Sequence, residues 1–146
     1  MVNLIIALIS IALIAIVAGA ALYNGGDAFR QGSAKASASQ LVNAGQQISA
    51  ANVLYSNDNG GTYAADLDTL TTDGEYLSSV PRVPENFATP TLGADNVITI
   101  TGSSTEICEA VNSQNGLDSI PADATGIDTY QYGCYGTEGS YTFEFK

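Results

Sequence analysis

Residues 2–22 read VNLIIALISIALIAIVAGAAL, and this stretch contains no charged residue. Ser10 is the single polar residue between Leu4 and Val17. About 20 apolar residues that rise about 1.5 Å each in a helix span the roughly 30 Å hydrocarbon core of a bilayer. A helix satisfies all the backbone hydrogen bonds of such a segment in lipid. The stretch therefore predicts an apolar, membrane-spanning helix over residues 1–26.

A secretory signal peptide is the alternative interpretation of the same stretch. Ala18-Gly19-Ala20 has the small-x-small form of a cleavage site. Against this, no Lys or Arg precedes the apolar run, and the run is longer than the apolar core of a typical signal peptide. These two features favour a helix that is kept.

Residues 27–56 predict a second, amphipathic helical stretch, which we call the stalk. Its apolar residues recur at steps of three and four and form one stripe, with Leu41, Ile48 and Tyr55 as the main packing residues. The opposite face is predicted to carry Gln40, Asn43, Gln47 and Asn52. Between the two stretches, Gly25 and Gly26 each cost a helix about 1 kcal/mol relative to Ala. We expect the stalk to be continuous, or nearly so, with the first helix.

Residues 57–146 change character and predict a small α+β head. Asn57 to Gly61 should stop the helix, a short helical turn is expected over 65–70, and 97–101 alternates as a strand does. A hydroxyl-capped helix is expected over 104–112, ending near Gly116. Residues 129–135 and 140–145 should form two strands around the turn 136–139, with one face of the last strand made by Tyr141, Phe143 and Phe145. The predicted fold class is α+β: a long N-terminal α-helix packed on a small antiparallel β-sheet head.

Charge and composition exclude several classes of function. Four Lys and Arg against fifteen Asp and Glu give a net charge of −11, which offers no electrostatic attraction for nucleic acid. Such a charge suits a soluble domain displayed outside the cell. The chain has no His, no Gly-x-Ser-x-Gly and no phosphate-binding loop. We expect neither an enzyme nor a cofactor, and we interpret the carboxylate pairs Asp66/Asp68 and Glu106/Glu109 as solvated surface.

Cys108 and Cys134 are the only cysteines. In an anchored domain outside the cytoplasm, two cysteines predict one disulfide. Closing the loop 108–134 would stabilise the head by about 3–4 kcal/mol in the chain-entropy model. A zinc site is a poorer interpretation because no His accompanies the two thiols.

Three acids inside this loop raise a minor hypothesis of calcium binding. Asp118, Asp123 and Asp128 lie in a stretch with Gly and Pro, and calcium prefers clustered oxygen ligands. Their spacing matches no EF-hand loop. Ordinary solvated loop acids are the competing interpretation, and we favour it.

The two indications of topology point in opposite directions. Arg30 and Lys35 are the first basic residues and follow the span, so the positive-inside rule places the head in the cytoplasm. The disulfide places it outside. Both hold if a basic leader preceded Met1 and was removed, and we therefore expect a trimmed chain.

The segment after the stalk resembles a known family. Tyr55-x-x-Asp58-x-Gly60-x-x-Tyr63, then Leu67-x-x-Leu70, Gly74 to Leu77 and Pro81 to Pro84, is similar to the corresponding segment of bacterial type IV pilins and type II secretion pseudopilins. Residues 107–111 are similar to the helix that carries the first cysteine of the terminal disulfide in the type IVb branch. The resemblance covers nearly the whole chain in order.

This resemblance implies a structural subunit of an extracellular filament with a role in adhesion, motility or uptake. Its partners would be identical subunits in a helical homopolymer, the inner membrane before assembly, a prepilin peptidase and the pilus assembly machinery. Cleavage and methylation are implied at Met1. The implied filament core is Leu4, Ile5, Leu8, Ile11, Leu13, Ile16 and Val17. The alternatives are a minor pilin or pseudopilin of a secretion system, and a periplasmic protein anchored by one span.

Two features bear on how such a filament would be held together. The family has a glutamate at mature position five, where this chain has Ile5. Ser10, Asn3 or a backbone carbonyl would replace it, or the subunit would occupy the filament tip. Related pilins also unwind part of the helix on assembly, which here points to Gly19, Gly25 and Gly26.

Overall fold

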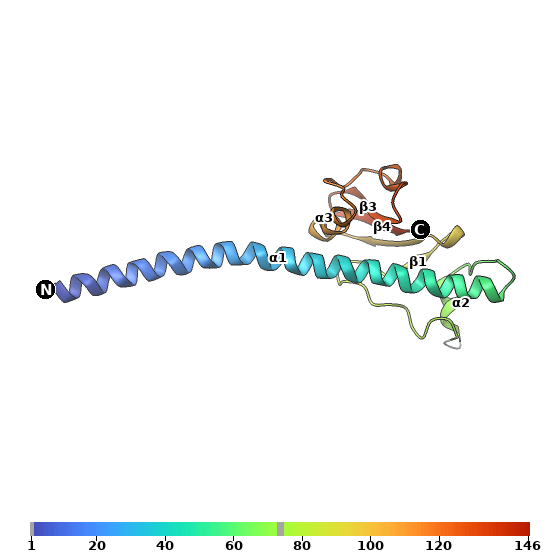
Figure 1. Ribbon diagram of the computed structural model, residues 1–146, viewed down its shortest axis with the longest axis horizontal. Coiled ribbons are helices and arrows are strands. Elements are labelled where there is room, and N and C mark those ends of the chain that lie inside the picture. The colour runs from blue at the N-terminus through green and yellow to red at the C-terminus, as the bar shows by residue number, and fades with distance from the viewer. Residues whose placement is uncertain (1, 73–74) are drawn as a thin grey trace. The chain divides into compact units, whose positions relative to one another are not determined.

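Helix α1 runs from Val2 to Asp58 without interruption (Figure 1). The computed structural model describes residues 2–72 and 75–146. Gly25 and Gly26 lie inside α1, so the expected continuity of the two helical stretches is confirmed. The helix ends where predicted, because Gly60 and Gly61 follow it with φ of 68° and 92°, a left-handed conformation that glycine adopts without strain.

The chain divides into two compact units, residues 1–33 and 34–146. This division differs from the predicted domains 1–26, 27–56 and 57–146. Most of the stretch predicted as a separate stalk belongs to the same unit as the head. Its apolar stripe is therefore part of the core of the head.

The head contains a four-stranded antiparallel sheet in the order β1-β2-β4-β3. Its strands are β1 (Thr91–Leu92), β2 (Ile98–Gly102), β3 (Tyr132–Thr137) and β4 (Ser140–Phe145). The α+β fold class is thus confirmed. Within the second unit, Figure 1 shows α3, β3 and β4 on one side of α1. The remaining elements are α2 (Leu67–Thr71), η2 (Ala94–Asn96), α3 (Thr105–Gln114) and η3 (Ala124–Ile127).

Most predicted elements of the head are present with small shifts of their ends. Ser104 caps α3 as expected, its hydroxyl accepting a hydrogen bond from Ile107 N at 3.4 Å. The strand expected from residue 129 begins only at Tyr132. The cause is η3 and the turn after it, in which Tyr130 N donates to Ile127 O at 3.0 Å. The two-residue strand β1 was not predicted, because it is too short for an alternating pattern.

The core of the head lies between α1 and the sheet. Leu41 and Ile48 are fully buried, and Tyr55 is half-buried with its ring edge-on to Tyr76, 5.4 Å between ring centroids. The packing role predicted for these three residues is thus consistent with where they lie. On the sheet, the buried face is made by Ile98, Ile100, Tyr141, Phe143 and Phe145.

Asn52 is not on the polar face of α1, where the sequence had placed it. It is fully buried, because it follows Leu41 by 11 residues, close to three whole helical turns. Its amide Nδ2 donates to Asn96 Oδ1 at 2.9 Å, and its Oδ1 accepts from Ala64 N at 2.8 Å. Asn96 in turn donates to Ser49 Oγ at 2.7 Å. The side chain thus connects α1 to two later segments of the head.

Gly45 lets the sheet approach α1 closely. A Cβ atom at this position would lie 2.8 Å from two ring carbons of Phe145, so Gly45→Ala should overpack the core by about 1–3 kcal/mol. Helix propensity offsets at most about 1 kcal/mol of this. We expect a lower thermal midpoint for the head, measured by circular dichroism. Gly32→Ala is the matched control, because nothing lies within 4 Å of its Cβ position. Equal midpoints for the two variants would contradict this packing.

Candidate functional site

The main candidate site is the apolar surface of α1 between Leu4 and Phe29. Its large apolar side chains are 55–80% exposed in the chain. One helix of the described residues, α1, is long and apolar enough to cross a membrane, judged by length and composition. The exposed side chains include every residue that the resemblance implies for a filament core, and they are Leu4, Ile5, Ile6, Leu8, Ile9, Ile11, Leu13, Ile14, Ile16, Val17, Leu22, Tyr23 and Phe29.

Residues 4–22 of this surface are apolar on all sides of the helix. A helix at the surface of a soluble domain has an apolar stripe and a polar face, whereas an apolar helix without a polar face is covered by lipid or protein. Exposed apolar patches larger than a few hundred Å² mark interaction sites in soluble monomers. By composition, residues 4–22 are thus typical of a helix that lies in apolar surroundings.

The polar groups of this segment are few, and Ser10 is satisfied locally. The Ser10 hydroxyl donates to Ile6 O in the preceding turn at 2.8 Å, which removes its unpaired donor from the apolar surface. Ile5 and Asn3 are both exposed. Met1, the implied site of processing and methylation, lies outside the described residues.

The three glycines proposed for unwinding are helical and open. Nothing lies within 4 Å of a Cβ atom at Gly19, Gly25 or Gly26. Packing within the described residues therefore gives no reason for glycine at these positions. Unwinding on assembly stays a prediction.

Aromatic side chains mark the end of the apolar segment. Tyr23 and Phe29 are about four-fifths exposed and flank the first acid, Asp27. Tyr and Trp are enriched at the two interfaces of a bilayer because their amphipathic rings suit the headgroup region, and Tyr23 fits this pattern. Phe29 was not among the residues predicted for the core of a filament, although it is as exposed as Tyr23.

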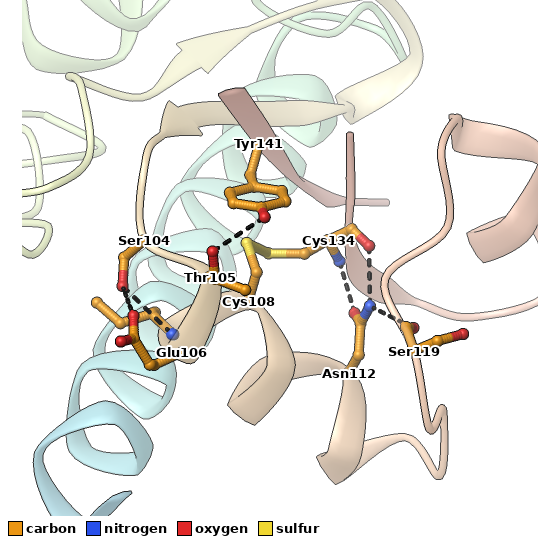
Figure 2. The surroundings of a disulfide bond; sticks show 9 residues. Ser104, Thr105, Glu106, Cys108, Asn112, Ser119, Cys134 and Tyr141 are labelled. Carbon is orange, nitrogen blue, oxygen red and sulfur yellow. Dashed lines mark hydrogen bonds between the residues drawn. A yellow bond between two sulfur atoms is a disulfide. The ribbon is translucent and has the colours of Figure 1, made fainter. Parts of the chain in front are cut away.

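The second candidate feature is the disulfide of the head. Cys108 and Cys134 are bonded, fully buried and 5.4 Å apart between Cα atoms, which confirms the predicted pairing. The bond joins α3 to β3 (Figure 2). Beside it, the hydroxyls of Thr105 and Tyr141 are 3.0 Å apart. The disulfide thus lies within the buried core of the head and links α3 to β3 covalently.

The structure does not bring the three loop acids together as a calcium site. Asp123 accepts a hydrogen bond from Thr125 N at 3.1 Å as the cap of η3, and Asp128 pairs with Lys146 Nζ at 2.9 Å. Across residues 2–72 and 75–146, no group of three or more His, Cys, Asp or Glu could hold a metal ion. Two of these acids thus have structural partners of their own.

Comparison with protein-family models, with curated proteins and with solved structures finds no match to this chain. The resemblance to pilins therefore rests on the residues quoted above. The proposal of a function therefore depends on the exposed apolar surface of α1 and on the structure of the head.

Two capping carboxylates predict how the stability of the head depends on pH. Hydrogen bonds from the Thr69 side chain and backbone lower the pKa of Asp66 below 3.8, and those from Thr125 lower the pKa of Asp123 in the same way. A lowered pKa gives stability that is present above pH 3.8 and is lost as the pH falls through the folded-state values. We expect the thermal midpoint to fall as the pH is lowered from about 4 to about 2. The double variant Asp66→Asn/Asp123→Asn should show a shallower fall, and an unchanged slope would count against this assignment.

Proposed function

We propose that this chain is a structural subunit of an extracellular filament of the type IV pilus kind. In this proposal the apolar helix anchors the subunit in the inner membrane before assembly. The helices of identical copies then pack together and form the core of the filament. The observation that carries the proposal is the exposure of every large apolar side chain between Leu4 and Val17.

The free energy of burying apolar surface favours contact of this helix with lipid before assembly and with the helices of other copies after assembly. Burying apolar surface contributes about 25 cal/mol per Å². Lipid satisfies this requirement as well as protein does, so the same surface can leave the membrane only for another apolar environment. A bundle of identical helices provides one.

Small residues on the apolar helix favour contact between copies over simple anchoring. They let two helix backbones approach closely, which is what drives helix association in lipid. An anchor alone has no use for them. They are Ala7, Ala12, Ala15, Ala18, Gly19, Ala20 and Ala21.

The head supports display on the outside of such a filament. It carries the −11 net charge, since unit 1–33 has one acid, Asp27, and one base, Arg30. Its disulfide suits an oxidising compartment. The stripe from Leu41 to Tyr55 gives no further support, because the head itself covers Leu41 and Ile48.

A minor pilin or a pseudopilin shares this physical design and differs in its task. A periplasmic protein anchored by one span is the competing proposal of another class. The two classes differ in what covers the apolar helix in its working state. The test must therefore change helix packing without changing membrane insertion.

The variant Ala12→Leu/Ala15→Leu is designed to change helix packing while membrane insertion stays the same. It adds apolar volume on one face of the helix, so insertion should be kept while close approach of copies is blocked. An overpacking cost of about 1.4 kcal/mol per subunit contact corresponds to about a tenfold loss of assembly. We expect wild-type amounts in the membrane fraction and about tenfold less chain in sheared surface filaments, both measured by mass spectrometry.

Leu8→Ile/Leu13→Ile is the matched control, because it conserves volume and apolar character. It should assemble as the wild type does. Wild-type filament yield from Ala12→Leu/Ala15→Leu would reject close packing of this face. A wild-type chain found only in the membrane fraction would support the anchored protein instead.

A further inference from the structure

Strand β3 is an edge of the sheet, and its outward backbone groups belong to Tyr132, Cys134 and Gly136. The register settles this, because Lys146 N donates to Gln131 O at 2.8 Å and bonded pairs alternate along an antiparallel ladder. An exposed edge strand is a template for pairing with another chain. Whether copies can pair through this edge of the sheet therefore depends on what the outward groups of these three residues bond to.

The side chain of Asn112 takes the place of a neighbouring strand at the centre of this edge. Its Oδ1 accepts from Cys134 N at 2.8 Å, and its Nδ2 donates to Cys134 O at 2.9 Å. Figure 2 shows the amide facing the backbone of Cys134 with both bonds side by side. This is the pair of bonds that one residue of an adjacent antiparallel strand would make through its own C=O and N–H. Asn112 is 1% exposed, so water does not compete for them.

Two further contacts occupy the edge on either side. Asn115 Nδ2 donates to Tyr132 O at 2.7 Å, and Gly136 N donates to Pro121 O at 2.8 Å. All three blocking groups come from the disulfide-bounded loop 108–134. The loop therefore bonds at least one outward backbone group of each of the three residues Tyr132, Cys134 and Gly136.

The disulfide fixes this cover in place. Cys108 precedes Asn112 by one helical turn of α3 and is bonded to Cys134, the residue that Asn112 pairs with. In addition, Gly133 lets η3 approach, since a Cβ atom there would lie 2.8 Å from Ile127. The helix, the bond and the glycine hold the loop against the strand.

The sequence of β3 explains why such a cover is needed. Residues 132–137 read YGCYGT and carry no charge, although the chain has a net charge of −11. Many exposed edges are protected by a charged side chain or a proline, and β3 has neither. An uncovered β3 would therefore be free to pair with β3 of a second copy.

We propose that loop 108–134 acts as a built-in substitute for a fifth strand, which prevents two copies of the chain from pairing through β3. The inference concerns the sheet edge of the head, and it stands whether or not the apolar helix forms a filament. It assigns Asn112 as the residue that closes the edge. It assigns the disulfide as the bond that keeps Asn112 there.

The test uses the full chain in detergent micelles and the variant Asn112→Ala. Hydrogen exchange of the Cys134 amide should become about tenfold faster, the effect of losing one hydrogen bond. The Tyr135 amide, on the β4 side of the strand, is the internal control and should keep its protection. Light scattering should show concentration-dependent association. Ser113→Ala, an exposed neighbour on α3, should leave both measurements unchanged.

A second substitution identifies the surface through which the variant associates. Tyr135→Lys places a charge on β3, and two such strands would repel each other. Asn112→Ala/Tyr135→Lys should therefore return to the size of the wild type while the amide of Cys134 still exchanges quickly. Association that persists in this double variant would contradict pairing through β3.

The variant Cys108→Ala/Cys134→Ala covers the case in which Asn112→Ala does not fold. It keeps Asn112 and removes the bond that holds it, so the amide of residue 134 should again lose protection and copies should associate. A protected amide with wild-type size in this variant overturns the proposal. Faster exchange without association in either folded variant overturns it as well.

Discussion

The contact between Phe145 and Gly45 is the constraint on which the head depends. Because Gly45 has no side chain, the ring of Phe145 lies directly against the backbone of α1. This approach brings β4, which has a strand on each side, onto the stripe that contains Leu41 and Ile48. The final strand of the chain is thus packed on its first helix, and the disulfide loop is then built outward from β3.

Helix α1 has two parts that differ in what surrounds them. One face of residues 34–58 is buried in the core of the head. On that face, Asn52 adds a buried polar connection to Asn96 and Ala64. Buried amides of this kind help a core to adopt one arrangement, because each partner would be costly to leave unpaired. Residues 4–22 have highly exposed large side chains and are apolar on all sides. That difference is the physical basis of the proposed filament.

How far the sequence could predict the structure depends on how far apart in the sequence the interacting residues lie. The apolar run, the helix stop at Gly60 and Gly61 and the cap at Ser104 are local patterns, and the structure has them where they were expected. The burial of Asn52 was missed because its partner Asn96 is 44 residues away, although counting 11 residues from Leu41 would have placed it on the buried face. The role of Asn112 at the sheet edge depends on the strand order, which no local pattern contains. The covering of the apolar helix depends on other molecules, so its exposure can be predicted from the sequence and its partner cannot.

The most direct test of the account is electron cryomicroscopy of filaments sheared from cells that produce this chain, with mass spectrometry to identify the subunit. The account predicts thin filaments in which residues 4–22 of neighbouring copies pack around the axis and the acidic heads face solvent. Such a map would also show what lies beside Ile5 and whether α1 is still helical between Gly19 and Gly26. Surface filaments that lack this chain, with the protein confined to the membrane fraction, would contradict the account.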